Sequence, residues 1–117
     1  MDWKYLFTSW QGRINRAKLW GGIGILVAIS VAAGILDRVF GTQIGEYRIG
    51  VISVLVSIAS IYFALALYAK RWHDRDKSGW WSLIGFVPFI GAVWMLVELG
   101  ILEGTRGINQ YGSDPLA

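Results

Sequence analysis

The sequence predicts an all-α integral membrane protein with three transmembrane helices and a short amphipathic helix ahead of them. Three apolar stretches carry this prediction: residues 19–36, 49–69 and 79–102, of which only the third contains a charge, Glu98. At about 1.5 Å rise per residue they reach roughly 27 to 36 Å as helices, enough to cross a hydrocarbon core about 30 Å thick. A chain of 117 residues, 55% of them hydrophobic, is too small to bury all three in a soluble core. We therefore expect a single membrane domain over residues 1–117.

Composition excludes several functions. The chain has no cysteine, so it can form neither a disulfide nor a thiolate metal site, and a single histidine is too few for a metal centre. The net charge of +3 and the isoelectric point near 9.5 fit orientation in a membrane better than nucleic-acid binding. We expect no cofactor, no metal and no nucleic-acid partner.

Residues 1–14 have the pattern of a helix lying on the membrane surface. Their apolar side chains recur at helical spacing on one face, and an irregular aromatic lead-in is the alternative. This face is formed by Trp3, Phe7, Trp10 and Ile14, with Leu6 beside it. Gly12 can end the helix, and Asn15 can cap the start of the first span.

The first two spans carry small residues at helical spacing, which allow close helix packing in lipid. Residues 19–36 form a retained span rather than a signal peptide, because the apolar run exceeds the 7–15 residues of a signal sequence. In the first span the small face is Gly24, Ala28 and Ala32; in the second it is Gly50, Ser53, Ser57, Ser60 and Ala64. We expect the two faces to meet within one chain, with a homo-oligomer interface as the alternative.

The third span contains Pro88, which predicts a kinked helix. The alternative is a re-entrant hairpin that turns at residues 87–91 and returns residues 103–117, the C-terminal tail, to the side it left. We favour three full spans, which place the tail opposite the N-terminus.

Charge predicts the orientation. Eight basic residues lie on the side of the N-terminus and of the loop after residue 69, against three on the other side. The positive-inside rule then makes the N-terminus cytoplasmic. We expect a multi-pass protein of a cytoplasmic membrane.

Residues 70–81, KRWHDRDKSGWW, are the richest in chemistry. Arg71 and Arg75 lie one helical turn apart and could grip one phosphate, but the more ordinary interpretation is a solvated loop with internal ion pairs. His73 beside Asp74 could transfer protons, but adjacent helical residues point about 100° apart. Anionic lipid is the favoured ligand.

Three segments together resemble a known family: GRINRAKLW from Gly12, KRWHD from Lys70 followed by SGWW from Ser78, and GTRGINQYGSDP from Gly104. The sequence resembles the small bacterial inner-membrane proteins of domain of unknown function 805, departing from them mildly at Lys70 and at Trp72, where the family usually has leucine. The resemblance implies a bacterial inner-membrane protein and no assigned activity. It also implies a docked tail, with Asn109, Tyr111 and Asp114 set against Arg13, Arg16 or Arg71.

The function expected from these features is a non-enzymatic binding or accessory module. Its basic, tryptophan-rich face would engage anionic lipid or a partner membrane complex; a homo-oligomeric channel or small transporter is the alternative, and a lipid-headgroup enzyme is a weaker one. The candidate binding residues are Arg13, Arg16, Arg71, His73, Asp74, Arg75, Ser78, Trp80, Trp81, Asn109, Tyr111 and Asp114.

Overall fold

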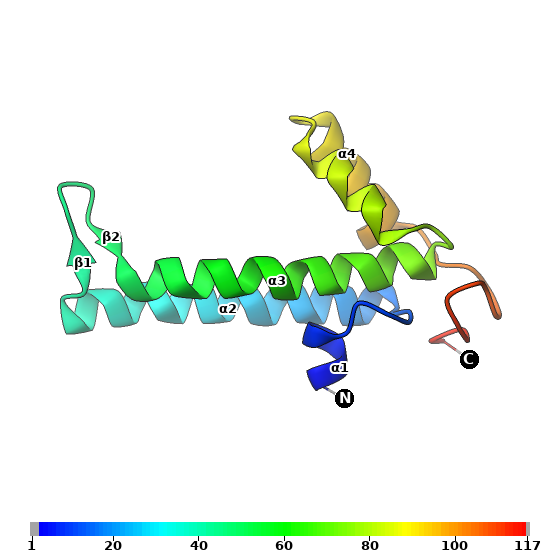
Figure 1. The fold of residues 1–117 in the computed structure, drawn as a ribbon, viewed down its shortest axis with the longest axis horizontal. Helices are drawn as coiled ribbons and strands as arrows, with labels where there is room; N and C mark the ends of the chain where they lie inside the picture. The colour runs from blue at the N-terminus through cyan, green and yellow to red at the C-terminus, as the bar shows by residue number, and fades with distance from the viewer. Residues whose placement is uncertain (1–2, 117) are drawn as a thin grey trace.

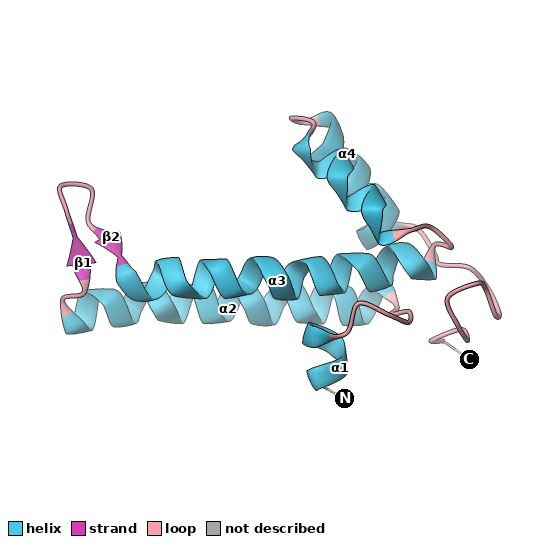
Figure 2. Cartoon of the chain, viewed as in Figure 1, coloured by secondary structure: helices cyan, strands magenta, loops and turns pink. Residues whose placement is uncertain are grey.

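Two long antiparallel helices form the body of the molecule, here a computed structural model whose described residues are 3–116 (Figure 1). They are α2 (Arg16–Phe40) and α3 (Val51–Asp74), and both are long and apolar enough to cross a membrane. A short hairpin of β1 (Gln43–Ile44) and β2 (Ile49–Gly50) joins them at one end, with Gln43 paired to Gly50 (Figure 2). The rest of the chain gathers at the opposite end.

Local sequence sets the limits of α2. The Asn15 side chain accepts a hydrogen bond of 2.9 Å from the amide of Lys18, which confirms the predicted cap. At the other end Gly41 adopts φ +65°, a left-handed conformation that ends helices and favours glycine.

The helix pair packs through a different face of α2 from the one predicted. Gly24, Ala28 and Ala32 are exposed, while the buried positions are Leu19, Gly22, Leu26, Ala33 and Asp37. A methyl group on Gly22 would lie 2.8 Å from the Leu67 side chain, so α2 and α3 pack closely at this glycine. The predicted packing face of α2 is therefore wrong. The helix packs through large apolar residues such as Leu19 and Leu26 together with Gly22, and not through a face of small residues alone. In the second predicted face Ser57 is exposed, whereas Gly50, Ser53, Ser60 and Ala64 are half-buried.

The N-terminal helix is shorter than predicted and lies against α3. Helix α1 covers only Trp3–Thr8, and residues 1 and 2 of the predicted helix lie outside the described part. Leu6 and Ile14 are buried in the core, and the ring of Phe7 meets that of Phe63 edge to face with centroids 5.9 Å apart. Much of the apolar face therefore packs on protein, and the helix ends before Gly12, whose φ is +89°.

The third apolar stretch is a hairpin, which corrects the prediction of one proline-kinked helix. A 3₁₀ helix, η1 (Gly79–Phe86), leads to a turn, and α4 (Ile90–Met95) continues into a π-helical segment, η2 (Leu96–Ile101), that runs back beside it. Pro88 sits in the turn and Phe89 has φ +62°. At Gly91 a side chain would clash with the carbonyl of Ile84, so glycine lets the two halves meet. Apolar length alone did not distinguish one long helix from two short ones.

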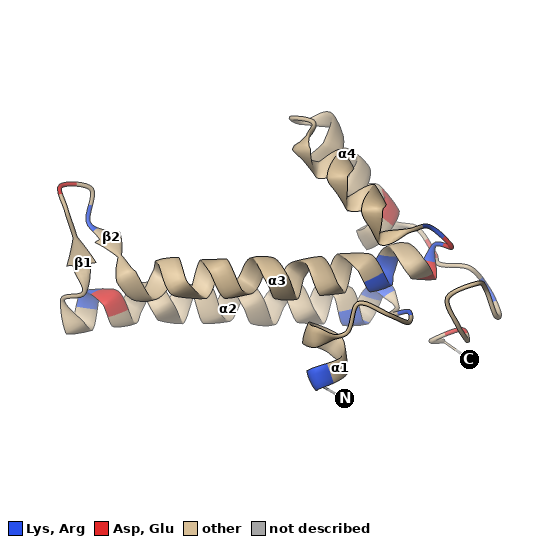
Figure 3. Ribbon diagram, viewed as in Figure 1, with Lys and Arg blue, Asp and Glu red and all other residues tan. Residues whose placement is uncertain are grey.

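The hairpin returns the chain to the end where it started. Residues 102–116 then run past the C-terminal end of α3 and the segment before α2, contrary to the expectation that the tail lies opposite the N-terminus (Figure 1). Figure 3 shows that the basic residues gather mostly away from the β-hairpin. Of the eleven lysines and arginines, only Arg38, near the end of α2, and Arg48, between β1 and β2, lie at the β-hairpin end. Eight of the others lie at the opposite end, which we call the basic end, and Lys4, in α1, borders Leu26, Ile29 and Phe63 nearer the middle of the pair.

Candidate functional site

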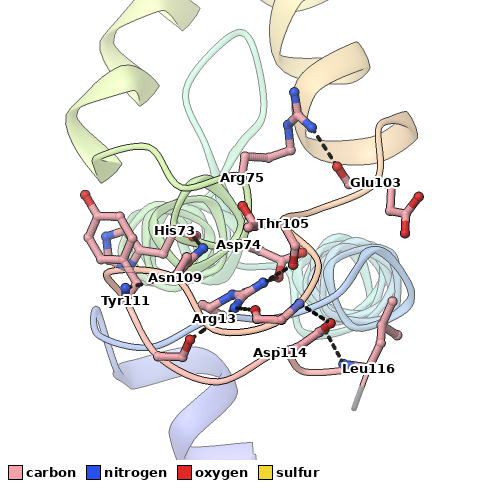
Figure 4. A network of polar contacts seen from close by, with 12 residues as sticks. Arg13, His73, Asp74, Arg75, Glu103, Thr105, Asn109, Tyr111, Asp114 and Leu116 are labelled. Carbon is pink, nitrogen blue, oxygen red and sulfur yellow. Dashed lines mark hydrogen bonds and ion pairs between the residues drawn. The ribbon is translucent and has the colours of Figure 1, made fainter.

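The three segments that carry the family resemblance meet at the basic end (Figure 4). Residues 12–16 approach from before α2, residues 70–75 form the last turn of α3 and its C-cap, and residues 104–114 wrap across both. The contacts that join them are polar and mostly buried.

Asp74 is the centre of this network. One oxygen, Oδ1, lies 2.9 Å from Nη2 and 3.1 Å from Nε of Arg13, and the other pairs with Nη1 of Arg71. Asp74 is 3% exposed, Arg13 5% and Arg71 0%. Each of these charges is expensive to bury alone, so removing one partner would leave the others uncompensated.

The remaining guanidinium donors bind backbone carbonyls. Arg71 donates to the carbonyl of Leu99 at 2.7 Å and to that of Leu102, where the hairpin ends. Arg13 donates to the carbonyls of Gly107 at 2.7 Å and Gly112 at 3.1 Å. The predicted phosphate grip by Arg71 and Arg75 is therefore wrong, because the Arg71 guanidinium is buried and bonded within the chain.

The tail is docked rather than frayed. The amide of Thr105 donates to the carbonyl of Asp74 at 2.6 Å, and Asn109 Nδ2 donates to the carbonyl of His73 at 2.9 Å. The Thr105 hydrogen bond brings the tail close to Asp74. This approach needs Gly104, since a side chain there would clash with the Asp74 carboxylate. The ring of Tyr111 stacks on that of His73 with centroids 4.0 Å apart.

Asp114 closes the tail on itself. Its carboxylate accepts hydrogen bonds of 2.9 Å from the amides of Gly107 and Leu116, and these bonds hold the pKa of Asp114 below its usual value. It makes no direct bond to the arginines against which it was expected to dock.

Lys70 performs a role that sequence reasoning missed. Its buried ammonium group donates to the carbonyls of Tyr5, Leu6 and Ser9 at 2.6 to 2.7 Å. An ammonium has three donors, so this arrangement satisfies the group and holds the end of α1 on α3. The signal was present, since Lys70 follows an apolar stretch and lies inside the helix.

A second set of contacts fixes the base of the hairpin. Glu98 accepts from Arg75 Nε at 3.0 Å and from Lys77 Nζ at 2.7 Å. Arg16 donates to the carbonyl of Ile101 at 2.7 Å, and Trp20 Nε1 to that of Gly100 at 2.9 Å. Arg16 and Arg75, both predicted to bind lipid, thus have partners in the chain.

Both predicted tryptophans are exposed, Trp80 at 78% and Trp81 at 44%. Trp81 also packs near the buried Trp72, with ring centroids 6.0 Å apart. Ser78 caps η1 by accepting from the amide of Trp80. The indole nitrogen of Trp72 is buried without a hydrogen-bond partner among the described residues, which fits a position where the family usually has leucine.

His73 does not form a pair with Asp74. Its Nδ1 lies 2.9 Å from the carbonyl oxygen of Gly12, while the Asp74 carboxylate is taken by arginines. The ring borders a cleft of about 450 Å³ between α3, η1 and the segment after α1, also lined by Trp10, Ser78 and Trp80.

The opposite end holds a second buried carboxylate that sequence reasoning also missed. Asp37, 0% exposed, accepts from the amides of Ile52 at 2.9 Å and Ser53 at 2.8 Å, and from the hydroxyls of Ser53 and Thr42. It caps α3 from the neighbouring helix. Its signal, an acidic residue directly after an apolar stretch, is weak.

The two long apolar helices, the shorter apolar hairpin and the charged end together define a small helical membrane protein. Comparison with known sequences agrees. The family described as "Protein of unknown function (DUF805)" matches residues 7–113, and the chain belongs to this family. This family match confirms the resemblance drawn from the three segments.

The relatives come from Escherichia coli. The chain is 34% identical to "Inner membrane protein YhaH" of strain K12, covering 98% of this chain and 97% of the relative. It is 34% identical to "Inner membrane protein YhaI", covering 93% and 87%, and 27% identical to "Uncharacterized protein YiiR", covering 95% and 88%. No solved structure matches. The protein is thus a bacterial inner-membrane protein, and neither the family description nor these names assign a catalytic activity.

Proposed function

We propose that this protein is a non-enzymatic module whose basic end lies at the cytoplasmic surface of the inner membrane and binds anionic phospholipid headgroups. The observation that carries the proposal is charge distribution: eight of the eleven lysines and arginines lie at one end of the α2–α3 pair, and only two lie at the other.

The proposed topology has two full spans and a re-entrant hairpin, with both termini in the cytoplasm. At about 2 Å per residue in a 3₁₀ helix, the eight residues of η1 reach roughly 16 Å, about half of the hydrocarbon core. A hairpin of this depth returns the tail to the cytoplasm. The positive-inside rule then favours this orientation by eight basic residues to two.

Few cations remain for lipid once internal contacts are counted. Lys4 is exposed and Lys18 half-buried, and within residues 3–116 neither forms an ion pair. Each lysine near an anionic surface contributes about 1 kcal/mol of attraction. Exposed indoles of Trp10, Trp20 and Trp80 add interfacial anchoring at the same end.

Quenching of tryptophan fluorescence by brominated lipid tests the proposal. Three of the seven tryptophans, Trp80, Trp81 and Trp94, lie in the hairpin, and the other four lie in α1, the segment after it, α2 and α3. In phosphatidylcholine vesicles, brominated phosphatidylglycerol should quench the protein more strongly than brominated phosphatidylcholine. The variant Lys4→Gln plus Lys18→Gln should lose most of this preference.

The matched control is Arg38→Gln plus Arg48→Gln, which removes the same charge from the opposite end. It should retain the preference. Equal quenching by both lipids in the wild-type protein, or an unchanged preference in the lysine variant, would contradict the proposal.

A further inference from the structure

The cleft beside His73 has the chemistry of a binding site for a neutral headgroup. Its walls come from α3, η1 and the segment after α1, and its volume is about 450 Å³. Apolar residues Leu65, Ala69 and Leu83 line it together with Trp10 and Trp80, and none of its lining residues is Asp, Glu, Lys or Arg. An anionic headgroup would find no cation here.

His73 presents a hydrogen-bond acceptor to this cleft. A carbonyl oxygen can only accept, so the 2.9 Å contact with Gly12 requires the proton on Nδ1. In the neutral ring Nε2 is then an acceptor, and no described residue bonds to it. Stacking on Tyr111, with the rings 5° from parallel, holds the imidazole in this orientation.

Two serines add hydroxyl groups to the same wall. Ser78 accepts from the amide of Trp80 and keeps its own proton free to donate. Ser82 Oγ is buried and has no partner among the described residues, although it lines the cleft. A buried hydroxyl without a partner is costly, and a bound polar group would relieve that cost.

We infer that the cleft binds one molecule of phosphatidylethanolamine. Its primary ammonium would donate to His73 Nε2 beside the indole faces of Trp10 and Trp80, which attract cations. The serine hydroxyls would donate to its phosphate, and one acyl chain would follow Leu65 and Leu83. The zwitterionic headgroup is neutral, as the cleft requires, and its N–H donors distinguish it from choline.

The cleft lies at the basic end but has no charged lining residue, so its ligand differs from the anionic lipid proposed for Lys4 and Lys18, and it does not depend on that proposal. Native mass spectrometry of the purified full chain gives the affinity for the first bound lipid. The probes are dioleoyl phosphatidylethanolamine, its mono- and dimethyl derivatives, and dioleoyl phosphatidylcholine. We expect about tenfold weaker binding of phosphatidylcholine, with most of the loss at the step that removes the last N–H, because one hydrogen bond to a charged group is lost.

Variants locate the effect. His73→Phe keeps an aromatic ring against Tyr111 but removes the acceptor, so it should bind all four lipids alike. Ser82→Ala removes only an unpartnered hydroxyl and should weaken phosphatidylethanolamine binding without lowering thermal stability. Leu83→Trp, at an exposed position of the lining, should fill the cleft and weaken all four lipids.

Lys4→Gln plus Lys18→Gln should keep the preference for ethanolamine, which separates this site from the lysines proposed to bind anionic lipid. Equal affinity along the methylation series in the wild-type protein would overturn the inference. So would a preference that survives in a folded Leu83→Trp variant.

Discussion

Each end of the α2–α3 pair buries an aspartate against a glycine, but the two carboxylates are stabilised by different kinds of partner. Asp37 is bound by two backbone amides and two hydroxyls from residues 42–53, all close to it in sequence. Asp74 is bound by two guanidinium groups, one of them 61 residues away. The first arrangement caps a helix and fixes a turn. The second joins three separate segments, so its loss should reach much further.

The largest effect is expected from Asp74→Asn. The substitution keeps the shape of the side chain but leaves Arg13 and Arg71 buried without a counter-charge, at a cost of about 3–5 kcal/mol in the free energy of unfolding. Titration with SDS in detergent micelles measures this cost. Trypsin should also cleave faster after the exposed Arg106, because the tail loses its anchor. Wild-type values for both would show that the network does not hold the end together.

The glycines beside the two aspartates form a matched pair for the next test. An alanine methyl at Gly104 would clash with Asp74, and one at Gly50 with Asp37. Overpacking of this kind costs about 1–3 kcal/mol. Gly104→Ala should speed tryptic cleavage after Arg106 alone, and Gly50→Ala cleavage after Arg48 alone. If either variant exposed both sites, the ends would not be independent.

Sequence reasoning reached some of this arrangement and missed the rest for identifiable reasons. The Asn15 cap follows from local chemistry, and the family segments named residues that do converge, including Arg13, Asp74 and Asn109. Apolar length is the same for one helix or for two half-helices, so it does not distinguish the hairpin from a full span. The close approach of Gly91 to the Ile84 carbonyl is a contact across the turn, and hydrophobic periodicity does not encode it.

The roles of Lys70 and Asp37 were missed for a different reason. Both partners are backbone groups: carbonyls of residues 5–9 for Lys70 and amides of residues 52 and 53 for Asp37. Backbone groups carry no sequence signature, so only tertiary structure shows which charge serves them. The loop expected after residue 69 included Lys70, and no role was expected for Asp37.

A smaller effect is expected from Asp37→Asn. The amide side chain can still accept hydrogen bonds, and no cation is left without a partner, so the cost should be about 1–2 kcal/mol, as for a helix cap. SDS titration of both aspartate variants under one condition provides the comparison. A cost equal to that of Asp74→Asn would contradict the distinction between the two ends.

The smallest expected effect concerns pH and the tail. Hydrogen bonds from Gly107 and Leu116 lower the pKa of Asp114 in the folded protein, so their stabilisation is present above the ordinary aspartate pKa of about 3.9. It is lost as the pH falls through the lowered value. Amide hydrogen exchange at Gly107 and Leu116 should therefore show an extra loss of protection below about pH 4, relative to Asp114→Asn. Identical profiles for the two proteins would remove Asp114 from the account.

The side of the membrane on which the tail lies tests the central claim most directly. The chain has no cysteine, so Ser113→Cys places one thiol in the exposed part of the tail, and Tyr47→Cys places one at the β-hairpin end as a control. In intact spheroplasts an impermeant maleimide should label Tyr47→Cys and leave Ser113→Cys unlabelled until lysis. Labelling of Ser113→Cys in intact spheroplasts would place the tail outside, away from a cytoplasmic Arg13 and Asp74, and would contradict the convergence of the three segments.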